Sequence, residues 1–128
     1  MLLEGIIVGV PILVIINSGA SHNFVSTALL KCLQLPITRT DSFEVCLGDR
    51  HHVVSSGLCK GLQVQLGEVL FEVGSYLFDI AGPDLILGMA WLETLGYVTS
   101  HWKKITMSFE FKGRQVSLTG DTAQPRCS

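Results

Sequence analysis

Charged residues are scarce in this chain, and its basic residues form no stripe. Of 128 residues, 16% are charged and 48% are hydrophobic, and the formal net charge is −2. This composition argues against intrinsic disorder. The basic residues are spread thinly from Lys31 to Arg126, so nucleic acid and anionic membranes are poor candidates for partners. A chain of this length forms one domain and buries enough surface to fold without metal or disulfides.

Cysteine is also sparse, and its spacing matches neither a zinc ribbon nor a redox pair. The cysteines are Cys32, Cys46, Cys59 and Cys127. We expect free intracellular thiols, with a disulfide framework as the alternative. The adjacent His51 and His52 would point to opposite faces of a strand, so they could not readily share one ion. We therefore predict no metal site and no cofactor.

The opening run, residues 1–16, is almost entirely apolar but differs from a targeting segment. Its only charge is Glu4, whereas a signal peptide begins with Lys or Arg, and Gly9 and Pro11 interrupt it. The run is shorter than the roughly 20 residues that cross a bilayer. We expect two buried strands, Ile6–Val8 and Ile12–Ile16, joined by a turn at residues 9–11. The predicted location is intracellular and cytoplasmic, with no membrane partner.

Apolar residues alternate with polar ones through much of the rest, which predicts a mostly β domain. One or two short helices are expected: one capped by Ser21 and ended by Pro36, and one at Met89–Leu95 before Gly96. The architecture expected is a barrel or sandwich over residues 1–120, with a flexible tail at residues 121–128. The strands are expected around Phe43–Leu47, Val53–Val54, Leu62–Leu66, Val69–Phe78, Leu85–Leu87, Val98–Trp102, Ile105–Phe109 and Val116–Leu118.

Several motifs in order carry a family resemblance. Val14–Ser26 reads Val-Ile-Ile-Asn-Ser-Gly-Ala-Ser-His-Asn-Phe-Val-Ser, and it resembles the active-site turn of retropepsins, in the version found in plant gypsy-type retrotransposon polyproteins. The resemblance covers the chain roughly from Gly5 to Gly120. Its other motifs are Phe43–Asp49, Gly57–Gly61, Leu85–Gly88, Trp91–Gly96 and Trp102–Phe109.

This resemblance implies a retropepsin-like closed β-barrel that acts as an aspartic endopeptidase on its own polyprotein. In such enzymes two carboxylates share one proton across a water molecule, so one acts as base and the other as acid. A chain of this length carries one such turn, and the second must come from an identical chain. The implied partners are therefore a second copy, in a homodimer, and a peptide or polyprotein substrate.

The resemblance also assigns roles by position. Asn17, Ser18 and Gly19 form the catalytic turn, in which Ser18 would lock the two turns of the dimer together. Gly19 would let the substrate backbone approach closely. The implied substrate-binding positions are Ala20, Ser21 and His22 beside the turn, Gly48, Asp49 and Arg50 at the tip of a flap, and Leu85 and Ile86 in the strand beneath the turn.

At Asn17 the sequence departs from the family, which has Asp there. An amide neither ionises near neutral pH nor exchanges protons as a carboxyl group does. Losing one positioned acid or base costs about 100- to 10,000-fold in rate, so a dimer with Asn17 on both chains is predicted to be inactive. The alternative is a non-catalytic peptide-binding or dimerisation module on the same scaffold. A third interpretation, an unrelated small β-barrel binding protein, requires the motifs to be coincidental.

Overall fold

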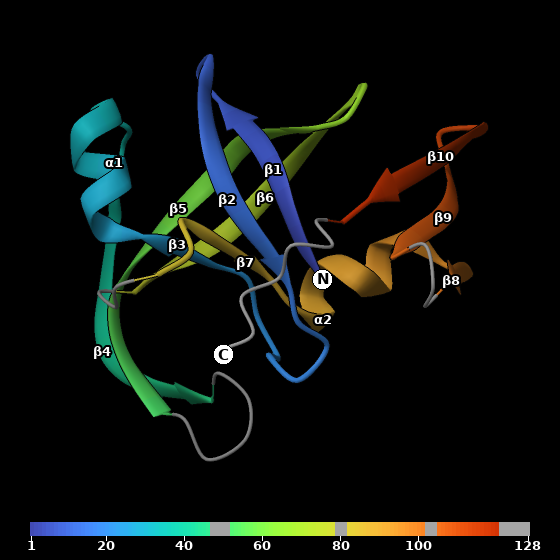
Figure 1. Cartoon of the computed structure of the whole chain (residues 1–128). Coiled ribbons are helices and arrows are strands. Elements are labelled where there is room, and N and C mark those ends of the chain that lie inside the picture. The colour runs from blue at the N-terminus through green and yellow to red at the C-terminus, as the bar shows by residue number, and fades with distance from the viewer. Residues whose placement is uncertain (47–51, 79–81, 102–104, 121–128) are drawn as a thin grey trace.

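The computed structural model describes residues 1–46, 52–78, 82–101 and 105–120, and it is mostly β, as predicted (Figure 1). The elements in chain order are β1 (Leu2–Ile7), β2 (Val10–Ile16), β3 (Phe24–Ser26), α1 (Thr27–Leu33), β4 (Thr38–Cys46), β5 (His52–Leu66), β6 (Val69–Phe78), β7 (Leu85–Leu87), α2 (Met89–Leu92), the 3-10 helix η1 (Glu93–Leu95), β8 (Val98–His101), β9 (Thr106–Phe111) and β10 (Arg114–Thr119).

Within these ranges, six strands close into a barrel. They follow the order β1-β2-β7-β3-β6-β5, and Ile6 of β1 pairs with Gln65 of β5 to complete the ring. Strand β4 extends from β5 as an antiparallel hairpin at the side of the barrel (Figure 1). A separate sheet, in the order β10-β9-β8, lies beyond helix α2. The predicted closed barrel with two short helices is therefore confirmed.

Strand β7 is inserted between two strands that precede it by some sixty to seventy positions in the chain. It runs parallel to β2, with Leu85 opposite Val14, and antiparallel to β3, with Leu85 opposite Val25. Asp84 fixes the beginning of this strand, because its carboxylate accepts a hydrogen bond from the Leu13 amide at 2.9 Å. This bond ties Asp84 to β2 and gives the residue a structural role.

The first hairpin turns one residue earlier than predicted. Val8 and Gly9 form the turn with φ values of 51° and 75°, and Pro11 already lies in β2 opposite Ile6. Positive φ at both central residues suits a two-residue hairpin because the turn's twist matches that of the strands. Gly9 adopts this backbone at no steric cost, whereas the β-branched Val8 is strained there.

The first helix begins later than predicted. Phe24 and Val25 are fully buried in β3, because the strand lies between β7 and β6. The helix-initiating residue is Ser26, whose hydroxyl accepts from the Leu29 amide at 3.4 Å. The segment after Ser21 is therefore loop and strand rather than helix, and burial between two neighbouring strands outweighs its helical spacing.

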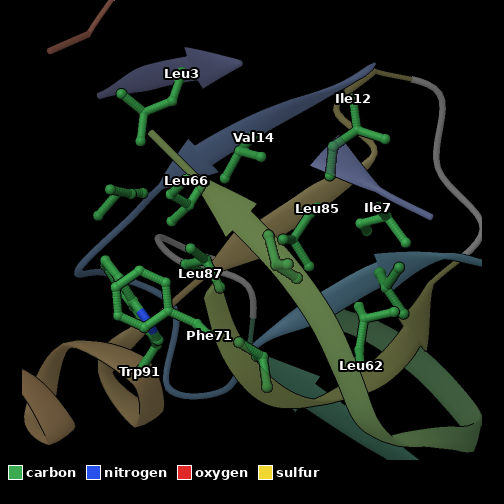
Figure 2. Close-up of a cluster of buried hydrophobic side chains, with 14 of the residues drawn as sticks. Leu3, Ile7, Ile12, Val14, Leu62, Leu66, Phe71, Leu85, Leu87 and Trp91 are labelled. Atoms are coloured by element: carbon green, nitrogen blue, oxygen red, sulfur yellow. The ribbon is translucent and has the colours of Figure 1, made fainter. Parts of the chain in front are cut away.

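The core fills the barrel and continues under α2 (Figure 2). Leu85 and Leu87 of β7 are fully buried, and replacing such a leucine with alanine costs about 2–5 kcal/mol. Trp91 of α2 packs edge-on against Phe71 of β6, with ring centroids 5.4 Å apart. This contact holds α2 against β6. No helix in the described ranges is long and apolar enough to cross a membrane.

Candidate functional site

The candidate site is the loop of residues 17–23, which leaves the end of β2 beside the end of β7. The backbone amide of Asn17 donates to the Leu87 carbonyl at 2.9 Å, so the first residue of the loop is hydrogen-bonded to the neighbouring strand β7. The Asn17 side-chain oxygen accepts from the Gly19 amide at 2.9 Å, and the Asn17 carbonyl accepts from the Ala20 amide at 3.1 Å. Such side-chain bonds two residues ahead are the usual way for Asx residues to hold a tight turn.

The tip of this loop faces solvent, and its other end is anchored in the barrel. Ser18 and Gly19 are exposed. Ala20 is completely buried with Phe24, Phe78 and Ile86, and its carbonyl accepts from the Met89 amide at 2.8 Å. Ala20, predicted to line the substrate cleft, therefore holds the loop against α2 in the single chain.

Asn23, which the sequence patterns did not single out, connects three parts of the site through its hydrogen bonds. Its side chain is buried, donates to the Gly74 carbonyl at 3.2 Å and accepts from the Gly88 amide at 3.0 Å. Its carbonyl accepts from the Tyr76 amide at 2.9 Å. No local signal in the sequence marks this role, because the partners Gly74 and Gly88 lie far from Asn23 along the chain.

Gly88 marks the closest backbone approach at the site. A Cβ added there would lie 2.3 Å from the His22 carbonyl oxygen and 2.5 Å from that of Ala20. Because both neighbours are backbone atoms, only a residue without a Cβ fits. The candidate loop and the start of α2 are therefore packed directly on each other at this point.

Ser21 and His22 form a second polar group at the exposed side of the loop. The Ser21 hydroxyl and His22 Nδ1 are 2.8 Å apart. The His22 ring stands edge-on to the Tyr76 ring, with centroids 5.2 Å apart. The ring is thus positioned from two sides while remaining exposed.

A pocket of about 550 Å³ opens beside the loop and reaches the second sheet. Its lining is largely apolar, and none of its residues in the described part of the chain carries a carboxylate. The pocket is lined by Met1, Ile16, Asn17, Ser18, Leu92, Val98, Ser100, Ile105, Thr106 and Met107. Asn17 and Ser18 therefore border a pocket whose described lining residues are largely apolar and include no acid.

This arrangement of an inserted strand and an Asx-Ser-Gly turn can be compared with known proteins. The sequence model described as retroviral aspartyl protease matches residues 3–112. The chain belongs to the retroviral aspartyl protease family. The match spans both β2 with the candidate loop and β7 with Gly88, the two segments that the barrel brings together.

Solved structures related to this family share the fold. The retroviral protease-like domain of Ddi1 from Leishmania major superposes with a TM-score of 0.67 at 14% identity, over 97% of this chain and 96% of that one. EIAV protease, solved with the inhibitor HBY-793, gives a TM-score of 0.59 at 18% identity, over 79% of this chain and 92% of that one. A comparison with curated protein sequences gives no significant match.

The other residues assigned to the site lie in two places. Leu85 is fully buried and Ile86 is 7% exposed, so in the single chain both support the retropepsin-like loop from below, and their assignment to the substrate site stays a prediction. Gly48, Asp49 and Arg50 lie outside the described residues. The backbone on either side of them pairs as β4 with β5, for example Val45 with Val53.

Among the described residues, burial shifts the pKa of two groups, the Met1 amino group and the Cys59 thiol. It lowers the pKa of the Met1 amino group, which donates to the Ile16 carbonyl at 3.1 Å beside the candidate loop. It raises the pKa of the Cys59 thiol in β5. Desolvation disfavours the charged form in both cases. In the described ranges, no cluster of His, Cys, Asp and Glu has a metal-binding arrangement.

Proposed function

We propose that this chain is the aspartic endopeptidase domain of a plant gypsy-type retrotransposon polyprotein, silenced by Asn17 at the catalytic position. The observation that supports this most is the turn at Asn17, where β2 and β7 end together within a family match covering residues 3–112. The proposed substrate is the polyprotein itself, bound as an extended peptide.

The proposed active form is a homodimer, because one chain brings only one Asx-Ser-Gly turn. Ser18 and Gly19 are exposed at the tip of that turn, as they must be to meet a second copy and a substrate. With Asp at both turns, two carboxylates would share a proton, one taking a proton from water and the other protonating the peptide carbonyl. The pair titrates as a unit.

Asn17 removes this chemistry but leaves the turn intact. The atom that accepts from the Gly19 amide is the side-chain oxygen, and a carboxylate has an oxygen in the same place. Asn17→Asp is therefore expected to keep the fold while restoring the acid–base pair. Each acid or base contributes about 100- to 10,000-fold, so the unmodified dimer should turn over near background.

The test is cleavage of an extended apolar peptide at mildly acidic pH by the unmodified chain, by Asn17→Asp and by Asn17→Ser. We expect pepstatin-sensitive cleavage by Asn17→Asp alone, and sedimentation showing dimers for all of them. Cleavage by the unmodified chain would contradict the silencing. An Asn17→Asp dimer without activity would contradict the protease assignment.

The alternative function is non-catalytic peptide binding or dimerisation on the same scaffold. One observation favours it: the Asn17 side chain is already hydrogen-bonded within its own turn, beside a pocket without a carboxylate in its described lining. Peptide binding by the unmodified dimer, with unchanged affinity in Asn17→Ser, would support this alternative.

A further inference from the structure

Over most of its length, one side of strand β6 has no partner among the strands that the structure describes. On one side β6 pairs with β5 from Val69 to Tyr76. On the other side it meets β3, which pairs only with Tyr76–Phe78. Among the described strands, none pairs with residues 69–75 on this second side. We call this side of β6, from Leu70 to Gly74, the β6 edge.

Two hydrogen bonds show which backbone groups point outward along the β6 edge. The Gly74 carbonyl accepts from the Asn23 side chain, and the Tyr76 amide donates to the Asn23 carbonyl, so both residues direct their backbone groups to this side. Backbone direction alternates along a strand, with a period of two. The N–H and C=O groups of Leu70 and Glu72 therefore point out of the β6 edge as well.

The β6 edge lies in a groove of about 740 Å³. Helix α2 contributes Ala90 and Trp91 to its wall, the end of β9 contributes Phe111, and the turn between β9 and β10 contributes Lys112. The Lys112 amino group lies 5.4 Å from the centre of the Phe111 ring. Leu70, which also lines the groove, is 55% exposed. In the described part of the chain, the groove thus combines outward-pointing backbone groups, apolar walls and the cationic side chain of Lys112.

The chemistry of the groove specifies its occupant. A row of alternating N–H and C=O groups is satisfied by another extended backbone, which is the basis of strand addition. The Glu72 carboxylate already accepts a hydrogen bond from the Gln63 side chain at 3.3 Å. The Lys112 ammonium, by contrast, is available to pair with an acidic group of a ligand. Because the edge is recessed between α2 and a hairpin turn, a single extended segment fits it better than a whole second subunit.

We propose that the β6 edge binds an extended peptide segment of a partner protein, which adds a strand to β6 and places an acidic side chain on Lys112. Five residues of extended chain span about 17 Å, the length of β6 from Leu70 to Gly74. This site is distinct from the Asn17 loop and does not depend on whether the chain is catalytically active.

The probe is the blocked peptide acetyl-Thr-Val-Thr-Val-Asp-amide, titrated into the isotope-labelled chain and followed by amide chemical shifts. We expect the largest shifts at Leu70, Glu72 and Lys112. Glu72→Pro removes the outward N–H without touching the ladder to β5, and proline is tolerated at such an edge. It should weaken binding about tenfold or more, whereas Glu72→Ala, which keeps the N–H, should bind like the unmodified chain.

Two further binding measurements test the proposal without relying on the proline variant. Lys112→Glu should weaken binding of the acidic peptide and favour the same peptide with Lys in place of Asp. A probe N-methylated at its central amides should not bind the unmodified chain. Three results would each overturn the proposal. The first is chemical shift changes confined to the Asn17 loop, and the second is no change at millimolar peptide. The third is self-association of the chain through the β6 edge, relieved by Glu72→Pro.

Discussion

Replacing Gly88 with alanine tests the close packing between the candidate loop and α2. The new Cβ would lie 2.3 Å and 2.5 Å from two backbone oxygens, so the loop or the start of α2 must move. Such overpacking costs about 1–3 kcal/mol. The movement also strains the bonds from Gly88 to Asn23 and from Met89 to Ala20, each worth about 0.5–1.5 kcal/mol. The sum of about 2–6 kcal/mol is a large part of a typical domain's stability, about 5–15 kcal/mol.

The assay is urea unfolding of Gly88→Ala beside the matched control Gly74→Ala. A Cβ at Gly74 meets no atom within 4 Å, so that variant should lie within about 1 kcal/mol of the unmodified chain. Amide spectra should show Gly88→Ala changes concentrated in residues 17–23. Equal unfolding midpoints for the two alanine variants would refute the reasoning, because they would mean that the loop and α2 are not in contact.

Other consequences can be measured on the same chain. Asn23→Asp replaces the donor to the Gly74 carbonyl with an acceptor, so we expect a loss of about 1–3 kcal/mol in unfolding free energy at neutral pH that becomes smaller when acid protonates the new carboxyl group. Ser26→Ala removes the cap of α1 and should cost about 1 kcal/mol in the same assay. Peptide-resolved thiol labelling should modify the exposed Cys32 quickly and the buried Cys59 slowly. Because burial raises the pKa of the Cys59 thiol, the stability that this thiol contributes is fully present below the pKa of a thiol in the unfolded chain. This contribution is lost as pH rises through the raised pKa of the folded state. Cys59→Ala should therefore reduce the fall of the unfolding midpoint at alkaline pH.

The period of the apolar residues was sufficient to place most strands of this fold. Val69–Phe78 and Leu85–Leu87 have the predicted bounds, because alternating or wholly apolar runs end there at turn residues. The predicted start of the first helix was wrong, because Phe24 and Val25 fit helical spacing but lie in a strand between β7 and β6. Long-range pairing of this kind leaves no local signal, so sequence spacing alone could not reveal it.

The candidate site was only partly visible in the sequence. Its turn at Asn17 could be named because strand, amide and glycine follow one another directly along the chain. The role of Asn23 could not, because its partners Gly74 and Gly88 lie far away in sequence and meet it only through the barrel. The β6 edge was likewise hidden, since which side of a strand remains unpaired depends on how short its neighbour β3 is.

The position of β7 also determines when the Asn17 loop can form during synthesis on a ribosome. Leu13 and Asp84, which join β2 to the beginning of β7, are 71 residues apart, and contacts so distant in sequence form late. Until residues 84–89 have left the exit tunnel, the Asn17 backbone amide and the Ala20 carbonyl lack their partners Leu87 and Met89. A nascent chain that stops before Leu85 would thus carry the loop's residues without its shape, and translation itself would delay any encounter of that loop with another molecule.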